Sequence, residues 1–116
     1  MMSGAQALIR SLAREGVGVV FALPGVQIMD AFDALYDEPA IRLVLVRHEQ
    51  SVTYMADGYA RTTGRPGVGL VVPGPGALNA TAGLGTAYAT SSPVLLICGQ
   101  IESYNLGENR GALHEI

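Results

Sequence analysis

Four short runs of branched aliphatic residues recur along the chain, and segments with helical periodicity separate them. Strands that are nearly continuous in valine, leucine and isoleucine are typical of parallel sheets, because helices cover both faces of such sheets. A helix between successive strands also supplies the crossover that parallel neighbours need. The alternation therefore predicts an α/β fold, a doubly wound parallel sheet with helices on both faces. The expected strands are 18–23, 41–46, 68–72 and 94–98.

Helical periodicity and stop signals place the expected helices between these strands. Apolar residues follow the spacing of one helical face within 5–13, 28–35 and 52–60, and a last helix is expected over about 77–90. Asp30, Asp33 and Asp37 fall on the other side of the second helix, where they predict a solvated face rather than a metal cluster. The apolar face of the third helix is expected to consist of Val52, Met55, Ala56, Tyr59 and Ala60.

The last helical segment, residues 76–90, contains three glycines, five alanines and no charged residue. A helix without a polar stripe needs cover on all sides, which one sheet of this size does not provide. We therefore expect a partner surface on this helix, in the same chain or in another copy. Prolines and glycines interrupt the wider charge-free stretch, 66–101, so no apolar span reaches the roughly 20 residues that a bilayer requires.

Charge and residue usage exclude several classes of function. The net charge of −3 and the absence of a basic cluster argue against a nucleic-acid surface. All seven basic residues are arginine, so this segment offers neither a Schiff-base lysine nor a P-loop lysine. The lone cysteine, Cys98, cannot form an internal disulfide, so we expect a reducing, cytoplasmic compartment. Its apolar neighbours predict a buried core thiol.

The irregular segments of the sequence all follow predicted strands. In a doubly wound sheet the ligand crevice lies beyond the carboxyl ends of the strands. We therefore expect these segments to meet at one edge of the sheet and to form a ligand site. They are LPGV at 23–26, RHEQ at 47–50, PGPGALN at 73–79 and GQIES at 99–103.

Glu49 lies where the second predicted strand stops and the third helix begins. A carboxylate in the first turn of a helix complements the helix dipole, worth roughly 0.3–1 kcal/mol, which is one interpretation of this residue. The other interpretation is a functional carboxyl in the crevice that exchanges a proton or hydrogen bond with a ligand nitrogen. His48 and His114, the two histidines, have no partner at zinc-ligand spacing, so no metal site is predicted. We expect His48 to point to solvent or to cap a local carbonyl.

The segment around Pro73 and Pro75 invites comparison with the dinucleotide-binding fingerprint, since it follows a strand and opens a helix. Asn79 replaces the third glycine, and the two prolines lack the N–H groups that would bind a phosphate. In this alternative Glu102 would be the ribose-binding acid. A loop this stiff is better suited to pressing a flat surface against a planar ring. Asn79 is then either a helix cap or a donor and acceptor for a heterocycle.

Together, four segments resemble the N-terminal pyrimidine-binding domain of thiamine-diphosphate enzymes, in the branch of acetolactate synthase and benzoylformate decarboxylase. HEQ followed by MADGYAR and then GPGxxN, in that order and spacing, is specific to this family. The resemblance covers essentially the whole chain, residues 1–116. The segments are FALPGVQIMDAFDAL, RHEQSVTYMADGYAR, GRPGVGLVVPGPGALNATAGLGTAY and LHEI.

The resemblance implies roles for particular residues. Glu49 would hydrogen-bond the ring nitrogen N1′ of the cofactor's aminopyrimidine and promote its imino tautomer. Pro24, Gly25, Pro75 and Asn79, matched by motif, would line the aminopyrimidine. His114 stands where many acetolactate-synthase-like members have glutamine before a glutamate, and it is the residue assigned to the substrate.

The resemblance also implies cofactors and partners. The cofactor would be thiamine diphosphate with Mg²⁺, which the family holds on a separate domain whose signature this sequence lacks. We therefore expect a pyrimidine-binding domain truncated at its C-terminus and inactive alone. Its partner would be the diphosphate-binding domain, contributed by a second subunit of a homo-oligomer, and the substrate would be a small 2-oxo acid. The alternative is a non-catalytic nucleotide-binding or assembly domain of the same fold.

Overall fold

The computed structural model describes residues 1–108 and 110–115. Its strands form one sheet in the order β2-β1-β3-β4, and every neighbouring pair is parallel. The sequence prediction of a parallel α/β sheet is confirmed, and each strand lies within one or two residues of its expected position. The strands are β1 (Val19–Ala22), β2 (Arg42–Leu45), β3 (Gly67–Val71) and β4 (Val94–Cys98).

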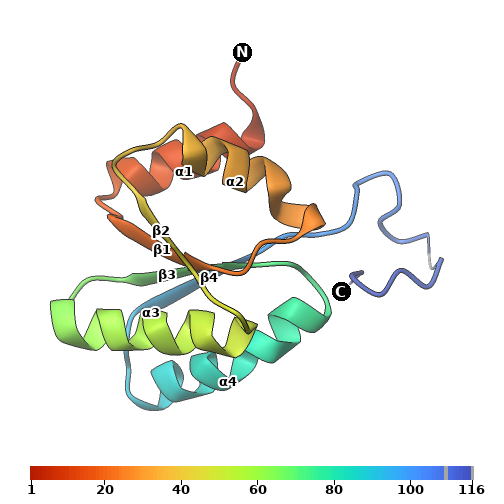
Figure 1. Ribbon diagram of the computed structural model, residues 1–116. Coiled ribbons are helices and arrows are strands. Elements are labelled where there is room, and N and C mark those ends of the chain that lie inside the picture. Colours follow the sequence, from red (N-terminus) through yellow and green to blue (C-terminus); the bar gives the residue numbers. More distant parts are fainter. Residues whose placement is uncertain (109, 116) are drawn as a thin grey trace.

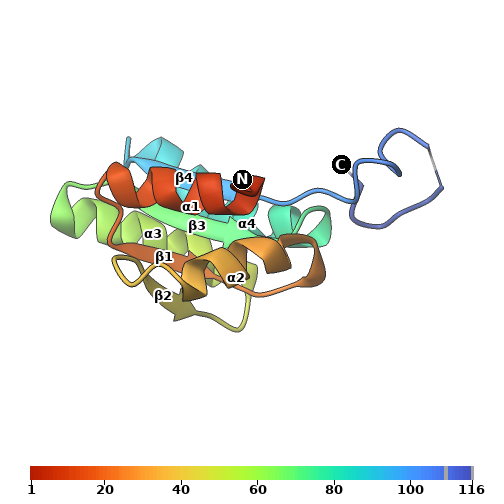
Figure 2. The same ribbon diagram turned by 90° about the horizontal axis from the view of Figure 1, so that it is seen from above.

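Helices cover both faces of the sheet, as Figure 1 shows. On one face lie α1 (Gly4–Arg14) and α2 (Met29–Tyr36), the latter preceded by the 3-10 turn η1 (Val26–Ile28); α3 (Glu49–Thr63) and α4 (Pro75–Ala89) lie on the other. α4 packs mainly against α3, and its main contacts with the sheet are with β3 and β4. Seen from above, the segment after β4 runs out beyond the helices (Figure 2). None of the helices in the described ranges is both long and apolar enough to span a bilayer.

Two apolar clusters, one on each face of the sheet, form the core. Side chains alternate between the faces along a strand, so β1 sends Val20 and Ala22 toward α1 and α2 but Phe21 toward α3. The predicted apolar faces of α1 and α2 are confirmed, because Ile9, Leu12, Ala31 and Leu35 are buried while the aspartates of α2 are exposed.

The third helix lies unusually close to β3 because β3 carries glycines at alternate positions. A Cβ on Gly67 would overlap the backbone carbonyl of Ala56, and one on Gly69 would lie 2.6 Å from Val52 Cγ1. Both Val52 and Ala56 are 0% exposed. The glycines therefore let α3 sit directly on the sheet. The N-terminus of α3 lies at the carboxyl edge because the helix begins shortly after β2 ends.

The predicted buried face of α3 is partly wrong. Met55 is 39% exposed, whereas Thr53 and Asp57, which the periodicity did not select, are buried. The reason is that α3 is covered on two sides, by the sheet and by α4. Thr53 and Asp57 lie on the side that meets α4, where polar groups find partners across the helix pair.

The prediction of a core position for Cys98 is also wrong, since the thiol is exposed. β4 is an edge strand, so an apolar sequence there does not imply burial on both sides. Leu95 of the same strand is 47% exposed for the same reason. Partial removal from water nevertheless raises the pKa of the Cys98 thiol, which disfavours the reactive thiolate.

Asp57 ties α3 to the turn after α4. Arg61 donates from Nε to Asp57 Oδ1 at 3.0 Å, and its Nη2 lies 2.7 Å from Asp57 Oδ2 and donates to Thr90 Oγ1 at 3.0 Å. The hydrogen bond from Arg61 and a second one from Ser92 hold the pKa of Asp57 below its usual value of 3.8, against the opposing effect of partial burial. A carboxyl with a lowered pKa stabilises the fold only while it is ionised.

We predict that Asp57→Asn lowers the free energy of unfolding at pH 7 and that this deficit shrinks in acid. The native pKa is depressed, so the contribution of Asp57 is complete above the unfolded value near 3.8 and is lost as the pH falls through the native pKa. Urea titrations of wild type and variant between pH 7 and pH 2.5 measure the deficit. Asp33→Asn on the exposed side of α2 is the matched control, and a deficit independent of pH would contradict the assignment.

Candidate functional site

The carboxyl ends of β1, β2 and β3 meet at one edge of the sheet. The chain leaves β1 toward β2 on one side, and later returns to β3 on the other side of β1. This reversal creates a topological switch point between β1 and β3, the usual position of a ligand crevice in such sheets. The segments after these strands contain Gly25, Glu49 and Pro75, so the predicted convergence of the irregular segments on one edge is observed.

Glu49 and Asn79 are joined across α3 and α4. Glu49 opens α3 and is half-buried, and its Oε2 accepts a hydrogen bond of 3.1 Å from Asn79 Nδ2 on α4. No described residue donates to the other carboxylate oxygen, Oε1. The first-turn position also aligns the carboxylate with the positive end of the α3 dipole. The pair thus presents one acceptor oxygen and one side-chain amide at the edge of the sheet.

Val72, directly after β3, holds the loops of this edge together. A Cβ on Gly25 would collide with Val72 Cγ1, and one on Gly76 would lie 2.6 Å from Val72 Cγ2 and 3.5 Å from Glu49 Oε1. Gly25 and Gly76 therefore leave just enough room for the Val72 side chain beside the carboxylate. Val72 is not among the residues expected at the site, and its position directly after the central strand β3 is the signal that could have identified it.

The turn before α4 has a backbone that only glycine adopts without strain. Gly74 has φ 61° and ψ −121°, and a Cβ there would lie 2.6 Å from the carbonyl oxygen of Leu113 and 2.8 Å from His114 Cα. The segment near the C-terminus thus folds back onto the PGPG turn. His114 is half-buried there, and its backbone is what meets Gly74.

Two local expectations are corrected by the hydrogen bonds. Asn79 is not a helix cap: α4 begins at Pro75, where the missing N–H is not needed, so Asn79 lies beyond the first turn and bonds Glu49 instead. His48 is exposed, as expected, but it does not cap a carbonyl: it caps the start of α3, where its Nδ1 accepts the N–H of Gln50 at 3.1 Å.

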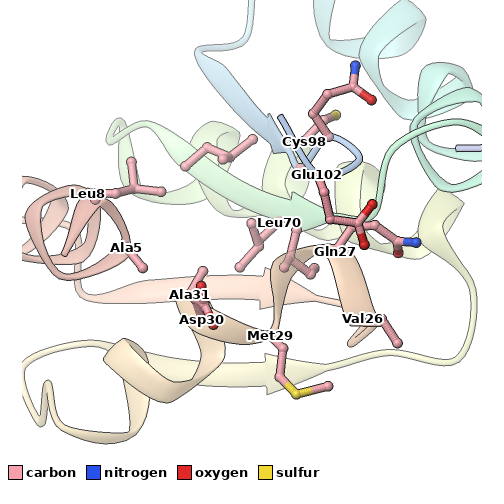
Figure 3. A pocket seen from close by; sticks show the side chains of 15 residues that line it. Ala5, Leu8, Val26, Gln27, Met29, Asp30, Ala31, Leu70, Cys98 and Glu102 are labelled. Atoms are coloured by element: carbon pink, nitrogen blue, oxygen red, sulfur yellow. The ribbon is translucent and has the colours of Figure 1, made fainter. Parts of the chain in front are cut away.

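Pro24 and Glu102 line pockets on the other side of the edge. Pro24 is exposed and, with Gly25, lines an apolar pocket of about 300 Å³. Glu102 lines a pocket of about 390 Å³ between the start of α1, the η1–α2 turn and the carboxyl ends of β3 and β4 (Figure 3). Neither pocket includes Glu49 or Asn79, so Glu102 does not belong to the group around Val72.

The residues at this edge fit an aminopyrimidine better than a metal or a diphosphate. A carboxylate with an uncommitted oxygen and a neighbouring amide match the ring nitrogens and exocyclic amine of such a heterocycle. Within 1–108 and 110–115 no group of three or more His, Cys, Asp or Glu side chains could hold a metal ion. The described residues therefore form no cluster of such side chains that would hold Mg²⁺.

Comparison with known proteins identifies the family. Residues 2–116 match the family described as thiamine pyrophosphate enzyme, N-terminal TPP binding domain. Two relatives are each 49% identical to the chain over 107 residues, which is 92% of this chain and 19% of each relative. They are the acetolactate synthase large subunit of Buchnera aphidicola subsp. Schizaphis graminum and the acetolactate synthase isozyme 3 large subunit of Escherichia coli K12.

A relative with a different name is nearly as similar. The probable 2-ketoarginine decarboxylase of Pseudomonas aeruginosa is 46% identical over 114 residues, which is 98% of this chain and 20% of that protein. The chain thus spans about a fifth of the length of the relatives it matches. The family match covers the parallel sheet and every residue of the Glu49 edge. The chain therefore belongs to the thiamine pyrophosphate enzymes and forms their N-terminal, pyrimidine-binding domain.

Proposed function

We propose that this chain binds and activates the aminopyrimidine of thiamine diphosphate in a 2-oxo-acid decarboxylase or carboligase of the acetolactate synthase type. The observation that carries the proposal is the half-buried carboxyl of Glu49, bonded to Asn79 and placed beside Gly76 at the switch-point edge. The names of the relatives, acetolactate synthases and a probable 2-ketoarginine decarboxylase, support the substrate class of 2-oxo acids.

In this proposal each residue at the edge has one task. Glu49 Oε1 shares a proton with N1′ of the ring, and Asn79 keeps the carboxylate oriented through Oε2. Gly25, Pro75 and Val72 form the stiff apolar wall beside the ring, with Pro24 at its rim. His114, whose backbone meets the Gly74 turn, is the residue that we assign to the substrate. Thiamine diphosphate, when held at its aminopyrimidine by these residues, would supply the carbon nucleophile.

The proposal includes a partner domain. Asn79 is exposed and Glu49 is only half-buried, so the edge forms one wall of a site whose opposite wall must come from elsewhere. The outer side of α4 and the neighbouring side of α3 expose Leu78 (64%), Tyr88 (90%) and Tyr54 (42%). We assign this surface to the diphosphate-binding domain of a second subunit, which would also hold Mg²⁺. The term complete enzyme is used below for this chain assembled with that diphosphate-binding domain.

Cofactor replacement tests the proposal. The complete enzyme, stripped of cofactor by dialysis against a chelator, should regain activity on a small 2-oxo acid only when thiamine diphosphate and Mg²⁺ are both added. The 116-residue chain alone should not bind the diphosphate form tightly in calorimetry, because the described residues provide no diphosphate site. Full activity without thiamine diphosphate, or saturable binding of adenine nucleotides by the chain, would contradict the proposal and favour a nucleotide-binding domain.

A further inference from the structure

Thr53 is a buried hydroxyl at the junction of α3 and α4. It lies one helical turn after Glu49 and is 0% exposed. A hydroxyl in such a place costs free energy unless it is hydrogen-bonded, and alanine or valine would pack there without that requirement. The bonds that Thr53 makes therefore indicate what it contributes.

The shorter bond of Thr53 connects the two helices. Its Oγ1 donates to the carbonyl oxygen of Ala80 on α4 at 2.7 Å, and the carbonyl of Gln50 in its own helix lies 3.2 Å away. Ala80 directly follows Asn79 in the chain. The bond thus fixes α4 at the residue next to the amide that contacts Glu49, while Thr53 itself is fixed to the turn that carries Glu49.

Gly83, one turn further along α4, sets how closely the helices approach. A Cβ on Gly83 would collide with Thr53 Oγ1 and would lie 2.6 Å from Thr53 Cβ and 2.7 Å from the backbone nitrogen of Tyr54. The backbones of α3 and α4 are therefore in near contact at Thr53. Sliding or rotation of α4 at this point would break the 2.7 Å bond or force Gly83 into α3.

We infer that Thr53 is a positioning residue, whose hydroxyl sets the placement of Asn79 relative to Glu49 and thereby the orientation of the catalytic carboxyl. The expected effect of Thr53 on catalysis rests on the proposed function. The expected effect of Thr53 on the Glu49–Asn79 bond does not depend on it. Thr53 touches neither reacting atom. It acts through Ala80 and α4, and the quantity it controls is the Glu49–Asn79 bond of 3.1 Å.

A matched pair of variants isolates the hydroxyl. Thr53→Ser keeps the oxygen and removes only the methyl group, whereas Thr53→Ala removes both. In the 116-residue chain, the side-chain amide protons of Asn79 should show an NMR shift from the bond to Glu49, identified by its loss in Glu49→Ala, which has no acceptor oxygen. We expect Thr53→Ser to keep this signature and Thr53→Ala to lose it, both measured well below their melting temperatures.

The same pair in the complete enzyme gives a kinetic result. Thr53→Ala should slow exchange of the cofactor C2 proton on the order of tenfold and lower kcat with little change in KM, because small misplacements of a catalytic group cost rate. Thr53→Ser should stay within about twofold of wild type. Should Thr53→Ala fail to fold, Thr53→Val replaces it, since it also lacks a donor.

The outcomes separate the two proposals. An Asn79 signature retained in Thr53→Ala would overturn the positioning role and leave Thr53 as packing. Equal exchange rates in the alanine and serine variants would do the same wherever Glu49→Gln does slow exchange. If Glu49→Gln left C2 exchange unchanged while the Asn79 signature still depended on the Thr53 hydroxyl, the proposed function would fail and the structural inference would stand.

Discussion

Replacing Glu49 by glutamine in the complete enzyme should slow exchange of the cofactor C2 proton by two orders of magnitude or more, the usual range for losing a positioned acid–base group. Glutamine keeps the length and the oxygen that accepts from Asn79, but it cannot share a proton with a ring nitrogen. Hydrogen–deuterium exchange at C2, followed by quenched-flow NMR, measures the effect. The fold and the assembly of the variant should be intact, because the half-buried side chain contributes little to the core.

The control for this experiment is another acid in the first turn of a helix. Asp30 holds that position in α2 and is exposed. If Glu49 only complements a helix dipole, then Glu49→Gln and Asp30→Asn should have the same small effect, below about 1 kcal/mol on unfolding, and neither should alter exchange. Unchanged exchange in Glu49→Gln would end the catalytic assignment.

Gly67→Ala should be the most damaging of the small substitutions in the chain, lowering the free energy of unfolding by about 3 kcal/mol, the upper end of the usual cost of overpacking. The added methyl would meet the backbone carbonyl of Ala56, and backbone inside a seated helix cannot swing aside as a side chain can. Relief requires α3 to lift from β3. Because Glu49 opens α3, the variant should also disturb the candidate site.

Gly58→Ala is the matched comparison for Gly67→Ala. Gly58 lies within α3 on its exposed side, and a Cβ there would meet nothing within 4 Å. Alanine should therefore stabilise the protein by about 0.5–1 kcal/mol, through helix propensity and a less flexible unfolded chain. Chemical denaturation of both variants tests the pair, and similar effects in the two would show that α3 is not seated on β3 as described.

The sequence predicted the positions of the helices and strands well, but it did not show which elements cover each of them. Runs such as 94–98 predicted strands correctly, because a buried or half-buried strand needs branched aliphatic residues whatever its place in the sheet. They did not distinguish a central strand from an edge strand, so Cys98 was wrongly placed in the core. Likewise the periodicity of α3 assumed one buried face, whereas α4 covers a second one and buries Thr53.

The candidate site was predicted in position but not in detail. The rule for carboxyl ends in parallel sheets placed Glu49 and Asn79 at one edge, although 30 residues separate them. Nothing in their spacing predicts that they bond each other, because the contact depends on how closely α3 and α4 pack. That packing is set by Gly83 against Thr53, and small residues in a sequence do not identify the surface they touch.

The position of β4 at the end of the sheet has a consequence for handling the protein. One side of this strand pairs with β3, and the described chain places no strand on its other side. The backbone amides and carbonyls on its outer side can therefore pair with another extended peptide, and the exposed side chain of Leu95 adds apolar surface there. At high concentration the isolated chain should therefore tend to aggregate through the free edge of β4. Additives that hydrogen-bond to the unpaired backbone groups of this edge should reduce the aggregation.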